Sequence, residues 1–255
     1  MAIVKVMTFN LWVDSVDSRD VRSFHNRKAG IVELIQTAAP DIIATQEGTQ
    51  AMLNELIERL GEAYLLQTFP RTLEPEAEQC AILVKSSKLS IVQSCSFALS
   101  KTPHLLGSIG WDATYPRICA SLTLRLLANP SQELTIYNTH LDNDGKQARE
   151  KSIEIIKETL LEENNPSILL GDFNATLEEE ALEQLIADKK IKHYSDDEGV
   201  IYDTFHNYGE VSFNQKIDHI FSNQNVSFLS TVVIQTGLEG LLPSDHYPLL
   251  AELQI

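Results

Sequence analysis

Five apolar segments follow one another in the middle of the chain without a helix between them. They span residues 64–69, 80–85, 89–97, 118–127 and 133–139, with turn residues such as Asn129 and Pro130 between them. Parallel neighbours need a long crossover, usually a helix, whereas antiparallel strands can be joined by short turns. The segments therefore predict antiparallel pairing, and they disfavour a purely parallel, doubly wound sheet.

The rest of the chain alternates strands with helices. Strand–helix–strand units are predicted at 3–9, 26–39 and 41–45 and again at 133–139, 145–163 and 167–170; further helices are predicted at 49–61 and 177–188, and further strands at 216–222, 226–235 and 247–254. Together these elements predict an α/β (α+β) fold in which two mixed β-sheets pack face to face and are flanked by helices. Because no Pro-, Gly- or Ser-rich linker interrupts the sequence, we expect a single domain over residues 1–255.

The chain of 255 residues carries 20 basic and 36 acidic residues, a formal charge of −16. Binding long nucleic acid through its phosphates requires a basic face, so strong binding of long duplexes is not expected. No run of about 18 apolar residues and no cleavable leader is present, which predicts a cytoplasmic protein without a membrane span. The three cysteines are widely spaced and form no zinc or disulfide pattern.

Polar residues gather just beyond the ends of the predicted strands, where open α/β sheets present their sites. They are Asn10, Gln46, Glu47, Asn138, His140, Asp172, Asn174, Asp218, Asp245 and His246. Carboxylate oxygens are the ligands that a hard cation such as Mg²⁺ prefers, often together with substrate phosphate oxygens. Imidazoles transfer protons near neutral pH, and amides can hold a phosphoryl oxygen without adding charge. The set suits metal-assisted chemistry on a phosphoester.

The motifs that hold these residues carry a family resemblance. In chain order they are MTFN, TQE, NTHLD, GDFNAT, KIDHIF and PSDHYP, between residues 7 and 248. This series resembles the endonuclease/exonuclease/phosphatase superfamily of metal-dependent phosphoesterases, and the stretches GSIGWDATYPRI and TFHNYGEVSFNQKIDHIF resemble a bacterial subgroup of it. The resemblance implies a DNase I-like four-layer sandwich. It also implies hydrolysis of a P–O bond by water with Mg²⁺ or Mn²⁺ as cofactor.

The same resemblance implies a metal site and the residues that handle water and phosphate. Glu47 would be the principal metal ligand, with Asn10 beside it. Asp245 would assist or bind a second ion. Asp172 would align or deprotonate the attacking water, and Asn174 would hold a nonbridging phosphate oxygen.

Two histidines complete the catalytic set that the resemblance implies. Asp218 would orient His246, which either polarises the phosphoryl group or serves as the base. His140 would steady or protonate the leaving oxygen, and Glu78 would be its partner. His219 is expected to face away from the site if Asp218 faces it, because successive residues of a strand point to opposite faces.

Three further residues are candidates for substrate binding. Arg117 could bind a phosphate through two parallel hydrogen bonds, and Trp111 could stack on a base or line an apolar pocket. The alternative is a packed loop closed by Pro116. Asn138 is the third candidate. The subgroup usually has Gly-Arg where Gln215 and Lys216 stand here, and the loss of that Arg weakens one expected phosphate contact.

These features favour an enzyme that cleaves a small or single-stranded phosphodiester or a phosphomonoester. A DNA-repair nuclease or RNase is the alternative from the same chemistry, and a non-catalytic scaffold of the same fold is the alternative from another class. A scaffold would be expected to have lost at least one of the five central residues, Glu47, Asp172, Asn174, Asp218 and His246, and all are present. The partner is thus a phosphoester substrate, and the oligomeric state stays open.

Overall fold

The computed structural model describes residues 2–14, 17–193, 203–210, 215–235 and 241–255. Its helices are α1 (Phe24–Ala38), α2 (Gln50–Leu60), α3 (Lys146–Glu162) and α4 (Glu180–Ile186). Residues 211–214, which belong to one of the two subgroup-like stretches, lie outside the described residues. None of the described helices combines the length and the apolar character needed to cross a bilayer.

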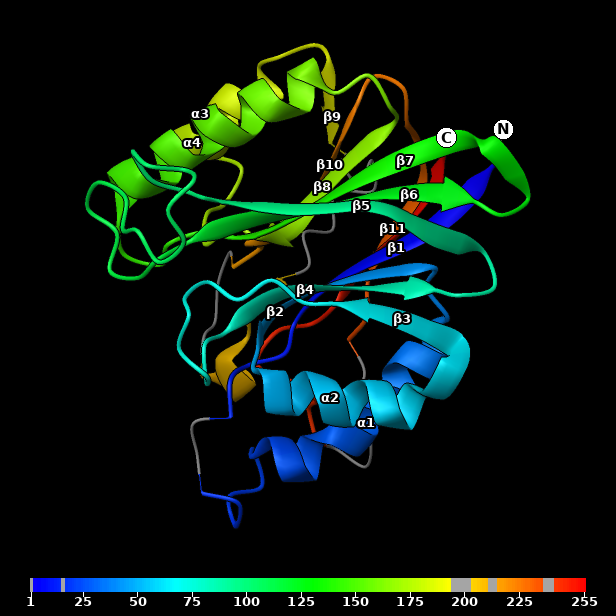
Figure 1. Cartoon of the computed structure of the whole chain (residues 1–255). Helices are drawn as coiled ribbons and strands as arrows, with labels where there is room; N and C mark the ends of the chain where they lie inside the picture. The colour runs from blue at the N-terminus through cyan, green and yellow to red at the C-terminus, as the bar shows by residue number, and fades with distance from the viewer. Residues whose placement is uncertain (1, 15–16, 194–202, 211–214, 236–240) are drawn as a thin grey trace.

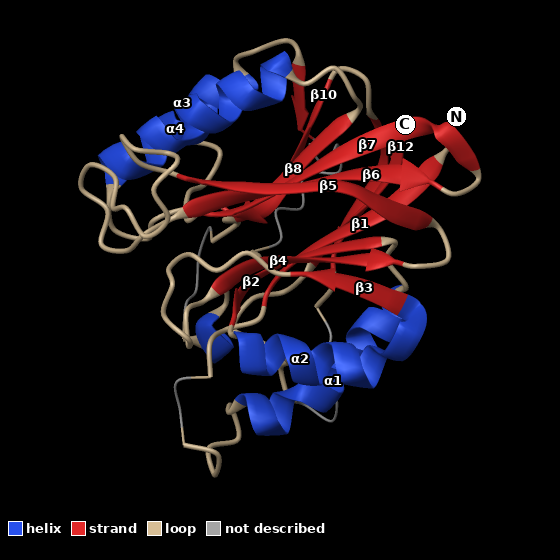
Figure 2. Cartoon of the chain, viewed as in Figure 1, coloured by secondary structure: helices blue, strands red, loops and turns tan. Residues whose placement is uncertain are grey.

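The described strands form two mixed sheets of six strands each. In spatial order the first sheet contains β11 (Ser227–Val233), β12 (Leu249–Gln254), β1 (Ile3–Asn10), β2 (Ile42–Gly48), β4 (Gln79–Lys85) and β3 (Tyr64–Gln67). The second contains β5 (Leu89–Ala98), β6 (Ile118–Leu126), β7 (Asn129–His140), β8 (Ser167–Asp172), β10 (Asp218–Asn223) and β9 (Ile191–His193). The sheets pack face to face, with α1 and α2 outside the first and α3 and α4 outside the second, so the chain forms four layers (Figures 1 and 2).

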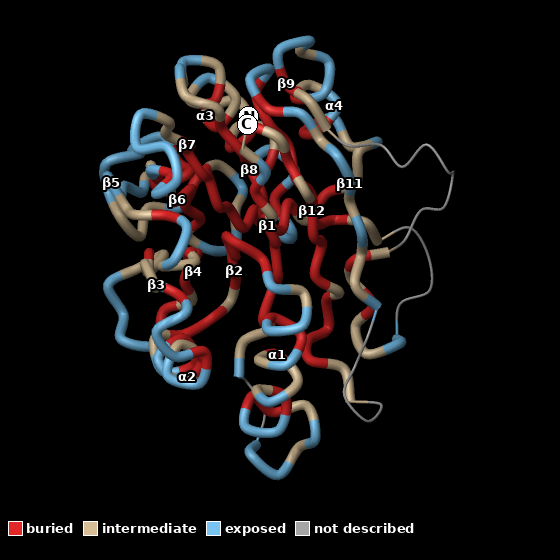
Figure 3. The backbone as a smooth tube through the Cα atoms, turned by 90° about the vertical axis from the view of Figure 1, so that its right-hand side faces the viewer, coloured by how far each residue is buried: buried red, intermediate tan, exposed pale blue. Residues whose placement is uncertain are grey.

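Three apolar clusters hold the four layers together. The largest lies between the sheets and includes Val6, Ile82, Ile136 and Leu170. A second joins the first sheet to α1 and α2, and a third joins the second sheet to α3 and α4. The central strands are accordingly buried along most of their length, whereas loops and outer helix faces are exposed (Figure 3).

The pairing of the strands follows the sequence pattern except between β4 and β5, which are consecutive in the predicted antiparallel run but lie in different sheets. Only β1 with β2 and β7 with β8 pair in parallel among the described strands, and each pair is linked through a helix; the other pairs are antiparallel. One predicted turn is wrong: Asn129 and Pro130 begin β7, and the turn lies at residues 127–128. A proline fits there because the first residues of a strand can lack a ladder hydrogen bond. The short β9 is an additional strand that the sequence did not predict.

Candidate active site

The strand register brings the predicted polar residues into adjacent rows. On the second sheet, His140 at the end of β7 is the register partner of Asp172 at the end of β8, and Asp172 is the partner of Asp218 at the start of β10. On the first sheet, Asn10 ends β1 opposite Gln46 of β2. Because the two sheets face each other, these strand ends meet at one edge of the sandwich.

A bulge in β2 directs Glu47 into this edge. The register of β2 against β4 shifts between Thr45 and Gly48, and Glu47 has a left-handed backbone with φ of 62°. Residues other than Gly adopt this left-handed backbone conformation at an energetic cost, and such strained residues are concentrated at functional sites. The carboxylate of Glu47 accepts hydrogen bonds from Asn10 Nδ2 at 2.9 Å and from the Val13 backbone N–H at 3.0 Å. Its position is therefore fixed from two sides.

In the Gly-Asp-Phe-Asn segment, the backbone geometry explains why the first residue is Gly171 and the last is Asn174. A Cβ on Gly171 would lie 2.0 Å from the carbonyl oxygen of Thr139, so only Gly allows β8 to approach β7 this closely. Asn174 adopts φ of 47°, which Asn tolerates, and its backbone N–H donates to Asp172 Oδ1 at 2.9 Å. Its side-chain amide donates to the carbonyl oxygen of Leu141 at 3.0 Å. The turn holds Asp172 and Asn174 in the same cavity.

His246 lies between two buried carboxylates. Its Nδ1 is 2.8 Å from Asp218 Oδ2, and its Nε2 is 3.7 Å from Asp172 Oδ2. Burial alone would lower the pKa of His246, but the charges of Asp218, Asp172 and Asp245 outweigh it and raise this pKa to about 10. Burial, followed by the charge of Asp218, raises the pKa of Asp172 to about 7. Asp218 thus orients the imidazole and stabilises its protonated form.

Asn10 links the two sheets at the site. Its side-chain Nδ2 donates to Glu47 Oε1 and to Asp172 Oδ2, both at 2.9 Å, while its side-chain Oδ1 accepts from the Trp12 backbone N–H. We predicted Asn10 as a metal ligand. In this structure its N–H groups, and not its oxygen, face the carboxylates, so it holds Glu47 and Asp172 at a fixed separation.

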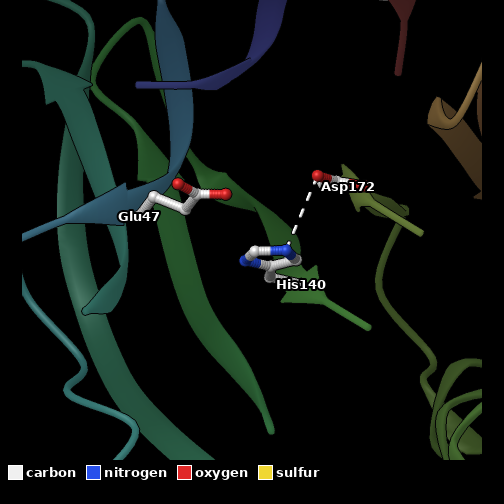
Figure 4. A group of neighbouring side chains, drawn as sticks. All are labelled: Glu47, His140 and Asp172. Atoms are coloured by element: carbon white, nitrogen blue, oxygen red, sulfur yellow. Dashed lines mark ion pairs between the residues drawn. The ribbon is translucent and has the colours of Figure 1, made fainter. Parts of the chain in front are cut away.

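His140, Glu47 and Asp172 form a group that could hold a cation. One ligand atom from each lies within 4.8 Å of the other two, and His140 Nε2 is 3.6 Å from Asp172 Oδ2 (Figure 4). Two carboxylates and a neutral imidazole suit a divalent cation. Burial, followed by the positive charge of Arg117, keeps the pKa of His140 well below its usual value. Ligand atoms of Asp172, Asp218 and His246 also lie within 4.8 Å of one another, and in this second group His246 Nδ1 is already hydrogen-bonded to Asp218, which leaves its Nε2.

Most of these side chains open into one cavity of about 500 Å³, whereas Asn10 and Asp218 are not part of its described lining. Its described lining consists of Trp12, Glu47, Arg71, Glu78, Tyr115, Arg117, His140, Asn143, Asp172, Asn174, Thr176, Glu179, Phe205, Gln215, Ile217, Asp245 and His246. This volume is within the range of about 300–1,000 Å³ that small-molecule sites occupy. Polar groups of both signs surround the predicted catalytic residues, with Trp12 and Phe205 as apolar walls.

Two predicted site residues have other partners in the structure. Glu78 lines the cavity, but its carboxylate accepts a hydrogen bond from Arg71 Nη2 at 2.7 Å instead of pairing with His140 as we predicted. Asn138 lies beneath the cavity, with its amide donating to the carbonyl oxygens of Thr45 and Ala81 and its oxygen accepting from Gln46. Because these contacts occupy its whole amide, Asn138 crosslinks the sheets and does not face a substrate.

Trp111 and Arg117 belong to the same loop but have different surroundings. Arg117 lines the cavity and donates to Asp142 Oδ2 at 3.3 Å and to Asn143 Oδ1 at 3.0 Å. Trp111, which we predicted to bind substrate, is not among the described lining residues. The next residue, Asp112, accepts from two backbone N–H groups at the start of α3, which has no side-chain cap of its own. This part of the loop is a packed closure.

Several residues of the cavity were not assigned to the site from the sequence. Arg71 follows β3 in a segment with no recognisable pattern, whereas Phe205 and Gln215 lie in the stretch TFHNYGEVSFNQKIDHIF that resembles the bacterial subgroup. Trp12 lies two residues after Asn10. Among these four residues, Arg71 alone lacked a nearby motif as a signal. Arg27 on α1 lies beneath the site, where it donates to the carbonyl oxygens of Leu11 and Trp12. His219 faces away from the cavity, as strand alternation predicted, with Nε2 3.0 Å from the carbonyl oxygen of Ala175.

Comparisons with known proteins agree with this geometry. A model of the Endonuclease/Exonuclease/phosphatase family matches residues 7–246. The chain is similar to the crystal structure of a family protein from Bacteroides thetaiotaomicron, with 28% identity, a TM-score of 0.90, and coverage of 99% of this chain and 97% of that one. A mannosyl-6-phosphatase from the same species is 28% identical with a TM-score of 0.87, covering 99% and 100%. An uncharacterized protein of Acanthamoeba polyphaga mimivirus is 23% identical over 97% of this chain and 98% of its own length. The likeness confirms the predicted DNase I-like sandwich.

Proposed function

This chain belongs to the endonuclease/exonuclease/phosphatase family, and we propose that it is a Mg²⁺- or Mn²⁺-dependent phosphatase acting on the phosphomonoester of a small polar alcohol. The cavity of about 500 Å³ around the predicted catalytic residues carries the proposal, because its size suits a small molecule. The similarity to a mannosyl-6-phosphatase supports a sugar phosphate as the substrate class. The chain's negative charge supports a small substrate over a long polyanion.

The cation would be held by Glu47, with Asp245 as a further carboxylate and Asn10 fixing the position of Glu47. Both carboxylates line the cavity, and burial raises the pKa of Asp245, which indicates that a nearby positive charge would stabilise its ionised form. A bound divalent cation neutralises charge on the phosphoryl group and lowers the pKa of coordinated water. The carboxylate oxygens present fit Mg²⁺ or Mn²⁺.

The protein residues supply positioning and proton transfer. Asp172 orients the attacking water, and the amide of Asn174 holds a nonbridging phosphate oxygen. His246, oriented by Asp218, donates to the phosphoryl group as negative charge develops on it. His140 stands at the leaving oxygen. Phosphoryl transfer needs no covalent intermediate, so this arrangement of donors and acceptors is sufficient.

Release of inorganic phosphate from a panel of small phosphomonoesters tests the proposal, with Mg²⁺, Mn²⁺ or excess EDTA present. We expect turnover that EDTA abolishes and that falls at least about 10³-fold in Asp172→Ala and His246→Ala. Arg125→Met, which removes an exposed ion pair with Glu133, is the matched control and should keep full activity. Turnover that persists in both catalytic variants would refute the roles assigned here.

A single-stranded oligonucleotide and a fluorogenic phosphodiester complete the panel. Faster hydrolysis of either one than of every phosphomonoester would replace the phosphatase proposal with a nuclease or phosphodiesterase. No metal-dependent turnover of any substrate would favour a non-catalytic protein of the same fold.

A further inference from the structure

Arg71 and Glu78 form an ion pair at the base of the loop that joins β3 to β4. Arg71 Nη2 donates to Glu78 Oε1 at 2.7 Å, and both side chains line the cavity. The loop is already closed by backbone hydrogen bonds, from Arg71 N to Glu78 O at 3.1 Å and from Cys80 N to Phe69 O at 3.0 Å. The side-chain pair is therefore not needed to close the loop.

A second segment fixes the orientation of Arg71. Its guanidinium carbon lies 5.0 Å from the ring centroid of Tyr115, and that of Arg117 lies 5.6 Å from the same ring. Cation–π contacts of this kind hold a guanidinium over a ring face. Arg117 is itself anchored by Asp142 and Asn143. Arg71 is thus preorganised before any substrate arrives, which lowers the entropic cost of binding.

The pair keeps hydrogen-bonding capacity free on the cavity side. Within the described residues, Arg71 uses one of its five side-chain N–H donors, and Glu78 Oε2 accepts from no group. Their side chains are 18% and 20% exposed. A donor and an acceptor therefore stand next to each other at the wall of the cavity.

The chemistry of this wall distinguishes a hydroxylated ligand from a second anion. Both arginines that line the cavity are already paired with carboxylates, Arg71 with Glu78 and Arg117 with Asp142, so among the described residues a second phosphate or carboxylate would meet no uncompensated arginine. A hydroxyl group both donates and accepts, so two neighbouring hydroxyls can donate to Glu78 and accept from Arg71 at the same time. An alcohol with adjacent hydroxyl groups matches the pair.

We propose that Arg71 and Glu78 bind two neighbouring hydroxyl groups in the alcohol part of the substrate and so select a phosphorylated polyol such as a hexose 6-phosphate. This inference rests on the proposed phosphatase function. The side chains of Arg71, Glu78 and His140 line the same part of the cavity. An alcohol whose oxygen stands at His140 extends toward the pair.

The test compares mannose 6-phosphate with butyl phosphate, since both release a primary alcohol but only the first carries neighbouring hydroxyls. In Arg71→Met and Glu78→Leu, we expect kcat/KM for mannose 6-phosphate to fall by about 10- to 100-fold, mainly through KM, with the value for butyl phosphate changed less than about 3-fold. Arg71→Lys should lose less than Arg71→Met. Glu76→Gln, in the same exposed loop, and Arg125→Met, which breaks an Arg–Glu pair of equal length on the surface, are the matched controls. Equal losses for both substrates would overturn the inference, because the pair would then act on the phosphate or through His140.

A binding measurement separates this inference from the proposed function. Ligand-observed NMR with methyl α-mannoside, which has no phosphate, in the presence of EDTA requires no turnover. We expect binding by the wild-type protein that is lost in Arg71→Met and kept in Arg125→Met. Absence of binding by the wild-type protein would overturn the inference. If no phosphomonoester is hydrolysed, the proposed function fails, while this binding result still decides the role of Arg71 and Glu78.

Discussion

Arg27 is a fully buried cation that ties together two loops of the site. From α1 its guanidinium donates to the carbonyl oxygens of Leu11 and Pro243 at 2.7 Å each, of Trp12 at 2.9 Å and of Arg22 at 2.5 Å. The first loop follows Asn10 at the end of β1. The second leads into the Asp-His pair before β12. We predict that Arg27→Met destabilises the fold and lowers activity together.

The magnitude follows from the number of bonds that are lost. A hydrogen bond to a charged group contributes about 1.5–3 kcal/mol, so four contribute about 6–12 kcal/mol. Burying the guanidinium costs several kcal/mol, and this cost disappears when Met replaces Arg27. The same burial lowers the pKa of Arg27 from its usual value. The free energy of unfolding should therefore fall by about 3–5 kcal/mol.

Urea unfolding followed by far-UV circular dichroism at pH 7 measures this change. The surface variant Arg125→Met should stay within about 0.5 kcal/mol of the wild type, because exposed ion pairs contribute little. Arg27→Lys should be intermediate, since an ammonium has three donors and Arg27 uses four. Phosphate release should fall in the same order. An Arg27→Met protein within about 1 kcal/mol of the wild type would refute the view that this network holds the site loops.

Three further outcomes are expected. Asp218→Asn should lower kcat by about 10²–10⁴-fold with KM nearly unchanged, because it removes the carboxylate that lies 2.8 Å from His246 Nδ1. A decrease in kcat of less than about 3-fold, measured by steady-state phosphate release, would contradict the orienting role of Asp218. His219 is fully buried and its pKa is lowered to about 4, mainly by burial, so the unfolded chain binds a proton below pH 6.5 that the folded protein takes up only near pH 4. The contribution of His219 to stability should thus be complete above pH 6.5 and fall by about 2 kcal/mol on going to pH 5. Urea titrations at the two pH values should show a loss that is smaller by about this amount in His219→Gln; the same loss in the variant and the wild type would exclude this contribution. Asp112→Ala should cost about 1 kcal/mol in the same unfolding assay, because it removes the acceptor for two N–H groups of α3, whereas no loss would show that water replaces it.

The sequence predicted the architecture well because its signals are local. Alternation and helical spacing depend on a few consecutive residues, and the two strand–helix–strand units gave the two parallel pairs of the structure. The same reasoning brought His140, Asp172 and Asp218 to one edge, since each ends or begins a strand. The strand register then aligned them side by side.

Local sequence patterns do not predict which residues on one face of a strand are covered by the facing sheet. Asn138 and His140 are two residues apart in β7, so alternation puts both on the same face. His140 opens into the cavity, whereas Asn138 is covered by Gln46 from the opposite sheet. No pattern within one strand tells how far the facing sheet extends over it.

By itself, the sequence determined most of the elements, the parallel or antiparallel sense of most strand pairs and the chemistry available at the ends of the strands. Only the tertiary structure decided which polar side chains share the cavity and which partners they have. Arg71 reaches Glu78 and Tyr115, and Arg27 reaches Pro243, from segments with no common motif. Such contacts depend on how loops from distant parts of the chain pack against one another, and no interaction between sequence neighbours encodes them.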